Sequence, residues 1–380
     1  MVKKWELIES KNRFYCDGRC LSGHDIGVFI LAIVLISITS GLFFAFDCPY
    51  LTIRLSPAIP VFAAILFLCV ICFIFRTACS DPGILPRGTS DEILYLERSN
   101  VTNSPHGVAL PGRTIEVQMH TGHVLQLKFC STCKVFRPPR VSHCSLCDAC
   151  IANFDHHCPW VGNCVGLRNY RYFYSFLFSL SILCLYILSF NITNLVLRRI
   201  TRIDEPEEIN FRISLLNELM PLSSQDKPSF IDAIRDTPAT IVEAIICFFS
   251  IWSIGGLCGY HTYLICRSIT TNEDIKHTWN SSRHGVTVKN PFSKGNGCVN
   301  CFSTLCGPLP PSFLNLRATV KADDHINRVK NEPMSTTNIE PIIQYQPEDN
   351  RRQNNNRMHS TTIHPYSDQK QNRRTPRDYI

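Results

Sequence analysis

Four stretches of this chain carry no Asp, Glu, Lys or Arg over about 20 positions each, and they limit the possible folds more than any other feature. They cover residues 28–46, 57–75, 172–192 and 244–265. A helix of about 20 apolar residues spans the hydrocarbon core of a bilayer, which is roughly 30 Å thick. A buried helix of a water-soluble protein explains one such stretch but not four. The sequence therefore predicts an α-helical polytopic membrane protein with four transmembrane helices.

The basic residues are distributed unevenly between the connecting segments. Most of the 38 Lys and Arg residues fall within residues 1–27, 76–171 and 267–380. Because cytoplasmic loops carry an excess of Lys and Arg, both termini and the long loop between the second and third spans are predicted to be cytoplasmic. The net charge of +7 then reflects this asymmetry, and we expect no nucleic-acid partner for a module tethered between two spans.

The predicted cytoplasmic loop contains a dense group of Cys and His residues. Their pairs at short spacing are typical of zinc sites, and a reducing cytosol disfavours disulfides. Two tetrahedral sites of three Cys and one His each would use all but one His and one Cys of the group. Its members are Cys130, Cys133, His143, Cys144, Cys147, Cys150, His156, His157, Cys158 and Cys164.

The run Asp155-His156-His157-Cys158 indicates chemistry for the two spare side chains. A thiol attacks as thiolate, a neighbouring His can take its proton, and a carboxylate can orient that His. Residues i and i+2 of an extended segment point the same way, so His156 is predicted to face Cys158 while His157 faces a zinc. We therefore predict Cys158 as nucleophile, His156 as base and Asp155 as its partner. A lipid thioester, whose chain enters the bilayer, is the expected electrophile.

The predicted segments follow from these features and from the turn signals between them. A hairpin is expected at 114–119 and 124–129, and the first outer loop is expected to contain Asp47. The segments are a cytoplasmic N-terminus (1–27), two spans with a short lumenal loop (28–76), a cytoplasmic linker (77–129), a Cys-rich zinc domain (130–171), a third span (172–192), a lumenal loop (193–240), a fourth span (241–266), a cytoplasmic segment (267–316) and a disordered tail (317–380).

Residues 130–170, with DHHCPWVGNCVG at 155–166, resemble the Cys-rich domain of the DHHC family of protein S-palmitoyltransferases. The segments at 290–295 and 305–312 resemble the subgroup of DHHC nine, fourteen and eighteen and the yeast Ras palmitoyltransferase. The likeness extends over residues 1–316. Two further family signatures are matched by Asp81, Pro82 and Gly83 and by Thr270, Thr271, Asn272 and Glu273.

The resemblance implies a two-step reaction, in which palmitoyl-CoA acylates Cys158 and a cysteine of a membrane-associated substrate protein then takes the acyl group. It implies that Thr271 hydrogen-bonds toward the catalytic loop and that Asn290 anchors cytoplasmic structure near the spans. Trp160 is a candidate for the acyl or CoA site. The resemblance also implies two structural zinc ions, one held by Cys130, Cys133, His143 and Cys150, and the other by Cys144, Cys147, His157 and Cys164.

The subgroup implies a Golgi or endoplasmic reticulum membrane, Ras-like substrates and a small accessory subunit. One departure puts contacts of that subunit in question, because Cys301 stands alone where the subgroup commonly has two adjacent Cys. His261 lies near the end of the fourth span and is expected at the membrane interface. Basic residues near the zinc domain could meet CoA phosphates, anionic lipid or only solvent; they are Lys128, Lys134, Arg137, Arg140 and Arg168.

Two other classes of function are compatible with parts of this pattern. A membrane-anchored zinc adaptor without turnover would use the zinc sites and leave Cys158 dispensable. A transporter would use the spans, but these have little polarity and no evident inverted repeat. The acyltransferase interpretation accounts for both the zinc ligands and the spare Cys-His pair.

Overall fold

The structure of the protein is a computed structural model that describes residues 2–8, 10–89, 114–118, 124–203, 235–279 and 290–320. The predicted disordered tail lies outside the described residues from position 321 onward. So do positions 204–234 of the predicted lumenal loop and the turn of the predicted hairpin at 119–123.

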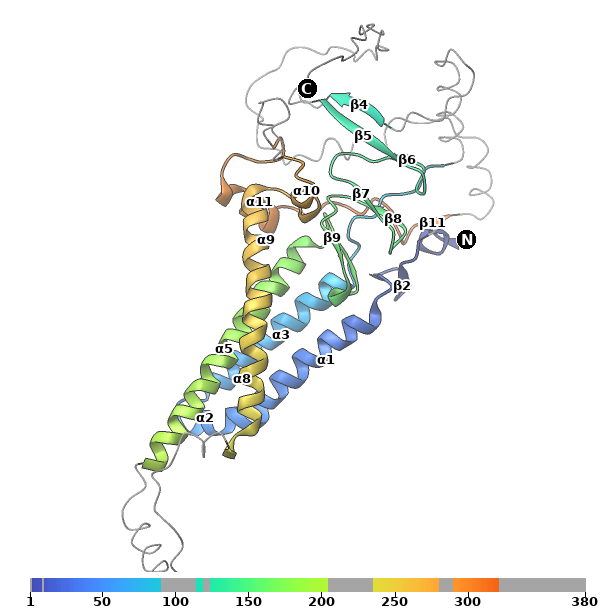
Figure 1. The fold of residues 1–380 in the computed structure, drawn as a ribbon. Helices are drawn as coiled ribbons and strands as arrows, with labels where there is room; N and C mark the ends of the chain where they lie inside the picture. Colours follow the sequence, from blue (N-terminus) through green and yellow to red (C-terminus); the bar gives the residue numbers. More distant parts are fainter. Residues whose placement is uncertain are drawn as a thin grey trace, which may run out of the picture. The chain divides into compact units, whose positions relative to one another are not determined.

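Four helices are long and apolar enough to cross a membrane, which confirms the predicted fold class. Figure 1 shows them side by side. Two of them contain a π-helical turn between α-helical parts. The spans are α1 (Ile26–Leu42) with η2 (Phe43–Asp47) and α2 (Cys48–Arg54), α3 (Ala58–Ala78), α5 (Tyr170–Ile203), and α8 (Pro238–Ser250) with η4 (Ile251–Gly255) and α9 (Gly256–Arg267).

The first helical segment continues beyond its uncharged stretch, so Asp47 lies within a helix and not in the expected loop. Its side chain is fully buried and accepts hydrogen bonds from Asn194 and from Thr240, the latter at 2.8 Å. These donors come from α5 and α8 and both bind Oδ1, so they offset part of the cost of burying this carboxylate, whose Oδ2 has no hydrogen-bond partner. Helix α5 likewise extends to Ile203, past the predicted end at 192.

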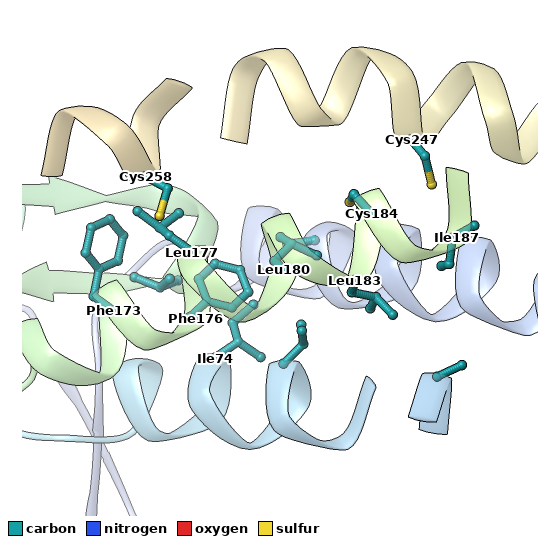
Figure 2. Packing of buried hydrophobic residues seen from close by; sticks show 14 of the residues in the cluster. Ile74, Phe173, Phe176, Leu177, Leu180, Leu183, Cys184, Ile187, Cys247 and Cys258 are labelled. Atoms are coloured by element: carbon teal, nitrogen blue, oxygen red, sulfur yellow. The ribbon is translucent and has the colours of Figure 1, made fainter. Parts of the chain in front are cut away.

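Helix α5 forms the centre of the bundle. Figure 2 shows α5 between α3 and α8, with Phe176 beside Ile74 of α3 and Cys184 beside Cys247 of α8. Close van der Waals packing of this kind is what associates helices in a bilayer, where lipid is as apolar as the side chains. The outward faces remain apolar as well, with exposed side chains such as Val61, Phe62, Leu68, Phe249 and Trp252. This distribution fits a lipid surround.

The Cys-rich module, residues 124–169, consists of short antiparallel pairs between α3 and α5. Strand β5 pairs with β4 in the hairpin expected from the sequence and also with β6, while β7 pairs with β8 and β9 with β10. The strands are β4 (Thr114–Gln118), β5 (Val124–Cys130), β6 (Val135–Phe136), β7 (Ser142–Cys144), β8 (Ala149–Ile151), β9 (His156–Cys158) and β10 (Asn163–Val165).

Segments from both ends of the described chain pack against this module. The N-terminal side supplies η1 (Lys4–Leu7), β2 (Arg13–Tyr15) and β3 (Cys20–Ser22), and the C-terminal side supplies α10 (Thr271–Ile275). Helix α11 (Gly297–Cys306) packs instead against α9. Strand β1 (Val2–Lys3) pairs with β11 (Thr319–Val320), so ordered structure continues slightly beyond the predicted start of the tail at 317.

Two asparagines attach the module to the end of α3. Asn163 Nδ2 donates to the carbonyl oxygens of Ala78 and Ser80 at 3.0 and 2.9 Å, and Asn169 Nδ2 donates to Thr77 O at 3.2 Å. The last carbonyls of a helix lack intrahelical donors, and these amides supply them. The loop that carries Cys158 is therefore fixed to the second span.

Candidate active site

Eight Cys and His residues of the module form two compact groups. In each group one donor atom per residue lies within 4.8 Å of the others. The first cluster is Cys130, Cys133, His143 and Cys150, and the second cluster is Cys144, Cys147, His157 and Cys164. These are the two sets that the resemblance implies, and Cys158 and His156 belong to neither.

The donor geometry of both clusters fits a tetrahedral zinc ion. His143 Nδ1 lies 3.4 Å from Cys133 Sγ, and His157 Nδ1 lies 3.4 Å from Cys147 Sγ and Cys164 Sγ. Zinc bonds of about 2.3 Å to sulfur and 2.1 Å to nitrogen give a tetrahedral edge of about 3.6 Å. Three thiolates and one imidazole are also the donor set of structural zinc sites.

Each metal-facing His has a carboxylate near its other ring nitrogen. His157 Nε2 lies 2.8 Å from Asp25 Oδ2, whereas His143 Nε2 lies 3.7 Å from Asp148 Oδ1. Such a carboxylate fixes the tautomer and orientation of a ligating imidazole. Asp25 immediately precedes α1, so the N-terminal segment takes part in the second cluster.

Strand β9 separates the roles of its three residues. Because alternate side chains of a strand point to opposite faces, His157 turns to the second cluster while His156 and Cys158 share the other face. Electrostatic interaction with the nearby Cys158 contributes to raising the pKa of His156. His156 Nδ1 lies 2.7 Å from Asp155 Oδ2. The structure thus brings together the three residues predicted for the reaction.

Asp155 is only 1% exposed, but its carboxylate is fully hydrogen-bonded. Thr271 donates to it through its backbone N–H and its hydroxyl, both at 2.8 Å. Burial alone would raise the pKa of Asp155, but the bonds from His156 and Thr271 hold that pKa below its usual value. Burial alone would lower the pKa of His156, but Asp155 and Cys158 outweigh it and raise that pKa to about 9. Asp155 therefore stays ionised and stabilises the positive charge of His156 once that ring has taken a proton.

The position of Thr271 follows from a capped helix. Thr270 Oγ1 accepts from Glu273 N at 3.2 Å, and Glu273 Oε2 accepts from Thr270 N at 2.9 Å, which is a capping box at the start of α10. Arg140 binds the Glu273 carboxylate with two nitrogens at 2.9 and 2.6 Å. The module is thereby joined to the segment after the fourth span, and Thr271 is held against Asp155.

Asp81 connects three segments near the same end of the bundle. Its Oδ1 accepts from Gly83 N at 2.8 Å, and its Oδ2 accepts from Arg168 Nη1 and Ser312 Oγ, both at 2.6 Å. Gly83 has φ of 106°, a backbone conformation that side chains disfavour. The turn expected at Asp81, Pro82 and Gly83 thus anchors the start of α5 and the C-terminal segment.

The last two predicted positions, Asn290 and Trp160, belong to different parts of the chain. Asn290 Nδ2 donates to the carbonyls of Arg267 and Ser268 at 3.1 and 3.0 Å, so it caps the end of α9. Trp160 follows Cys158 in η3 (Pro159–Val161) and is 52% exposed. Helix α1 contacts η3, which places Trp160 close to the first span.

A family model described as DHHC palmitoyltransferase matches residues 123–278. Human palmitoyltransferase ZDHHC18 is 48% identical over 322 residues, which are 84% of this chain and 76% of that protein. Human palmitoyltransferase ZDHHC9 is 43% identical over 344 residues, which are 90% of this chain and 86% of that protein. This chain belongs to the DHHC palmitoyltransferase family.

Human palmitoyltransferase ZDHHC14 is 48% identical over 324 residues, which are 84% of this chain and 61% of that protein. This DHHC family member therefore spans about three fifths of the length of the ZDHHC14 relative that it matches.

Sequence reasoning missed several residues that support the DHHC site. Asp25, Asn163 and Asn169 act across long sequence distances, so no local pattern of residues indicated their roles. His261 was expected at the membrane interface but is 1% exposed inside the protein, with Nδ1 3.0 Å from the hydroxyl of Tyr170. His261 belongs to α9 and packs against α5, so its side chain is buried even though it lies near the end of the fourth span.

Proposed function

We propose that this protein is a protein S-palmitoyltransferase that acts in two steps. The observation that carries the proposal is the alignment of Asp155, His156 and Cys158 on and beside β9, against the membrane-spanning helices. A nucleophile beside a base that is itself hydrogen-bonded to an orienting carboxylate provides the groups that acyl transfer through a thioester needs.

In the first step the Cys158 thiol gives its proton to His156, and its sulfur attacks the carbonyl carbon of palmitoyl-CoA. His156 Nδ1 is bound to Asp155, so Nε2 is the nitrogen that takes the proton. When the tetrahedral intermediate collapses, the bond to the CoA sulfur breaks and that sulfur takes the proton from His156. Asp155 stabilises the imidazolium in between.

The second step repeats this chemistry with a different thiol. A cysteine of a membrane-associated protein gives its proton to His156 and attacks the thioester on Cys158. The Cys158 sulfur leaves and recovers the proton, which returns the enzyme to its starting state. The balance of both steps requires only the two thioesters and the substrate thiol.

The two clusters would each hold one structural zinc ion through their three Cys and one His. Such an ion supplies folding free energy and a fixed loop geometry. The second cluster would hold His157 and Cys164, which flank Cys158 in sequence and pair with each other across β9 and β10. The protein's own side chains then carry every proton transfer.

The acyl chain would lie among the spans, near Trp160. Burial of about 0.8 kcal/mol per CH2 makes a long chain worth on the order of 10 kcal/mol. Arg140 and Arg168 are engaged by Glu273 and Asp81, so they are weak candidates for the CoA phosphates. A better candidate surface combines Lys128, Arg137 and Lys276, because burial and the two neighbouring cations lower the pKa of Lys276.

The setting of the reaction is also part of the proposal. The distribution of Lys and Arg supports a cytoplasmic active site with both described ends on the same side. The proposal extends to a Golgi or endoplasmic reticulum membrane, Ras-like substrates with membrane-proximal cysteines and a small accessory subunit, as the resemblance to the DHHC nine, fourteen and eighteen subgroup implies.

The direct test is acylation of the purified protein in detergent with labelled palmitoyl-CoA. Wild type is compared with Cys158→Ser, and each sample is divided and treated with hydroxylamine, which cleaves thioesters. The expected result is a hydroxylamine-labile label on wild type and none on Cys158→Ser. Absence of label on zinc-replete wild type, with and without a co-expressed accessory subunit, would contradict the proposal and favour a zinc adaptor.

A further inference from the structure

A second imidazole lies beside the proposed catalytic pair. One ring nitrogen of His261 lies within 4.8 Å of donor atoms of Asp155 and His156. The ring centroids of His261 and His156 are 5.9 Å apart. His261 belongs to α9, in the fourth span, and ionisable residues that face the interior of a membrane bundle usually serve a function. The two-step reaction above assigns it none.

The orientation of the His261 ring is set by Tyr170. The Tyr170 hydroxyl lies 3.0 Å from His261 Nδ1, and both side chains are buried. A phenol donates readily to an unprotonated ring nitrogen, so the proton of neutral His261 is on Nε2. Tyr170 begins α5, directly after the Cys-rich module. The contact therefore joins the third and fourth spans at the level of the active site.

The ring of His156 is confined from several directions. Its centroid is 5.2 Å from that of Phe173, and the centroids of Phe173 and His261 are 5.1 Å apart. Asp155 holds Nδ1. With Nδ1 bound to Asp155 and two further rings packed against it, the His156 imidazole has little freedom to rotate. Loss of one boundary would allow the ring to rotate.

We propose that His261 is a positioning residue for His156 and that Tyr170 holds His261 in place. The inference rests on the proposed acyl transfer, because it concerns the base of that reaction. His261 acts through His156 and Asp155 and not on the substrate. Misplacement of a reacting group by about 1 Å can reduce a rate about 100-fold.

The same two helices provide a matched control. Tyr174 lies one turn further along α5, and its hydroxyl is 3.0 Å from Thr262 Oγ1 on α9. Tyr170→Phe and Tyr174→Phe each remove one hydroxyl from one hydrogen bond between the same helices. Only the first of these bonds involves His261. The pair of variants therefore separates positioning of His156 from general packing of the spans.

The experiment measures two rates on each variant. One is the rate constant for acylation of Cys158 at saturating palmitoyl-CoA, together with the KM for the donor. The other is the rate of Cys158 alkylation by iodoacetamide, followed by peptide mass spectrometry, which reports on the nucleophile without any acyl donor. The variants are His261→Leu, His261→Gln, Tyr170→Phe and Tyr174→Phe.

The expected result is a fall of about 10- to 100-fold in both rates for His261→Leu, with KM unchanged. His261→Gln should recover part of the loss, because an amide can still accept from Tyr170. Tyr170→Phe should fall between these values, and Tyr174→Phe should match wild type. Zinc content and thermal stability identify variants that are misfolded. If His261→Leu is misfolded, the rates of His261→Gln and Tyr170→Phe test the positioning role in its place.

Two outcomes would overturn the inference. In the first, folded His261→Leu keeps both wild-type rates. In the second, Tyr174→Phe loses as much as Tyr170→Phe, which would assign the effect to packing. If wild type is not acylated at all, the proposed function fails, and the alkylation rates still support or overturn the positioning role of His261.

Discussion

The two Cys3His clusters have the same donor set but different surroundings. The ligands of the first cluster all fall within residues 130–150, whereas those of the second continue to Cys164 and so include both strands around Cys158. Asp25 contacts the second cluster from outside the module at 2.8 Å, while the nearest carboxylate of the first is Asp148, at 3.7 Å on the same module.

The two clusters also differ in the segments that supply their hydrophobic neighbours. Leu21 from the N-terminal segment and Leu314 from the C-terminal segment pack with the second cluster, and Lys11 N donates to Cys147 O at 3.1 Å. The first cluster packs with Leu85 and Phe313. Both clusters thus pack with segments outside the module, but the second also packs with the N-terminal segment and has ligands on both strands around Cys158. Disturbance of the second cluster should therefore affect the chemistry more.

The largest difference between the two clusters is expected in the rate of Cys158 acylation after one ligand is removed from each. Cys164→Ser frees the strand opposite β9, so we expect the rate of Cys158 acylation to fall more than about 100-fold. Cys130→Ser should lower it about tenfold, because that ligand is at the far end of the module. Acylation rate and zinc per protein are measured on the same preparations.

Both variants should lose one of two zinc ions, which serves as the control that each site was damaged. Equal losses of acylation in Cys164→Ser and Cys130→Ser would show that the module behaves as one unit and would remove the contrast between the clusters.

A smaller difference is expected in the stability that two arginine–aspartate pairs of the module contribute. Arg168 and Asp81 are 17% and 6% exposed, whereas Arg87 and Asp148 are 28% and 30% exposed. Arg168→Met leaves a buried carboxylate without its cation, which costs about 3–5 kcal/mol. Arg87→Met should cost about 0–1 kcal/mol. Thermal unfolding in detergent measures both.

The double variant Asp81→Asn with Arg168→Met tests the cause, because it removes the buried charge together with its partner. It should be more stable than Arg168→Met alone. Similar melting temperatures for Arg168→Met and Arg87→Met would refute the assignment of the stronger anchor to Asp81.

The smallest difference is expected in the rate of zinc release when the carboxylate near the second ring nitrogen of each metal-facing His is replaced. Loss of such a partner typically lowers metal affinity 10- to 100-fold. Asp25→Asn should therefore release zinc from the second cluster faster by about that factor. Asp148→Asn should change release only a few-fold, because 3.7 Å exceeds hydrogen-bond range. Release is followed with a chromophoric chelator.

Native mass spectrometry during the chelator reaction gives the number of ions still bound and so shows how far each site has emptied. A faster release from Asp148→Asn than from Asp25→Asn would reverse the proposed order of the two carboxylates.

Local sequence pattern was sufficient for the spans and for the face of β9. Uncharged length predicts a membrane helix without knowledge of its neighbours, and i, i+2 alternation placed His156 with Cys158 and His157 away from them. The same logic failed for Asp47 and His261, where a polar side chain near a helix end was expected at an edge. Partners on other helices, Thr240 and Tyr170, bury them instead.

By itself, the sequence determined the four spans, the proposed catalytic residues and the candidate metal ligands, because each depends on spacing within a short segment. Only the tertiary structure decided that Asp25 supports His157, that Thr271 holds Asp155 and that His261 borders His156. These pairs are separated by about 100 residues or more. Contacts at such separation arise from the packing of helices and strands, which no local periodicity encodes.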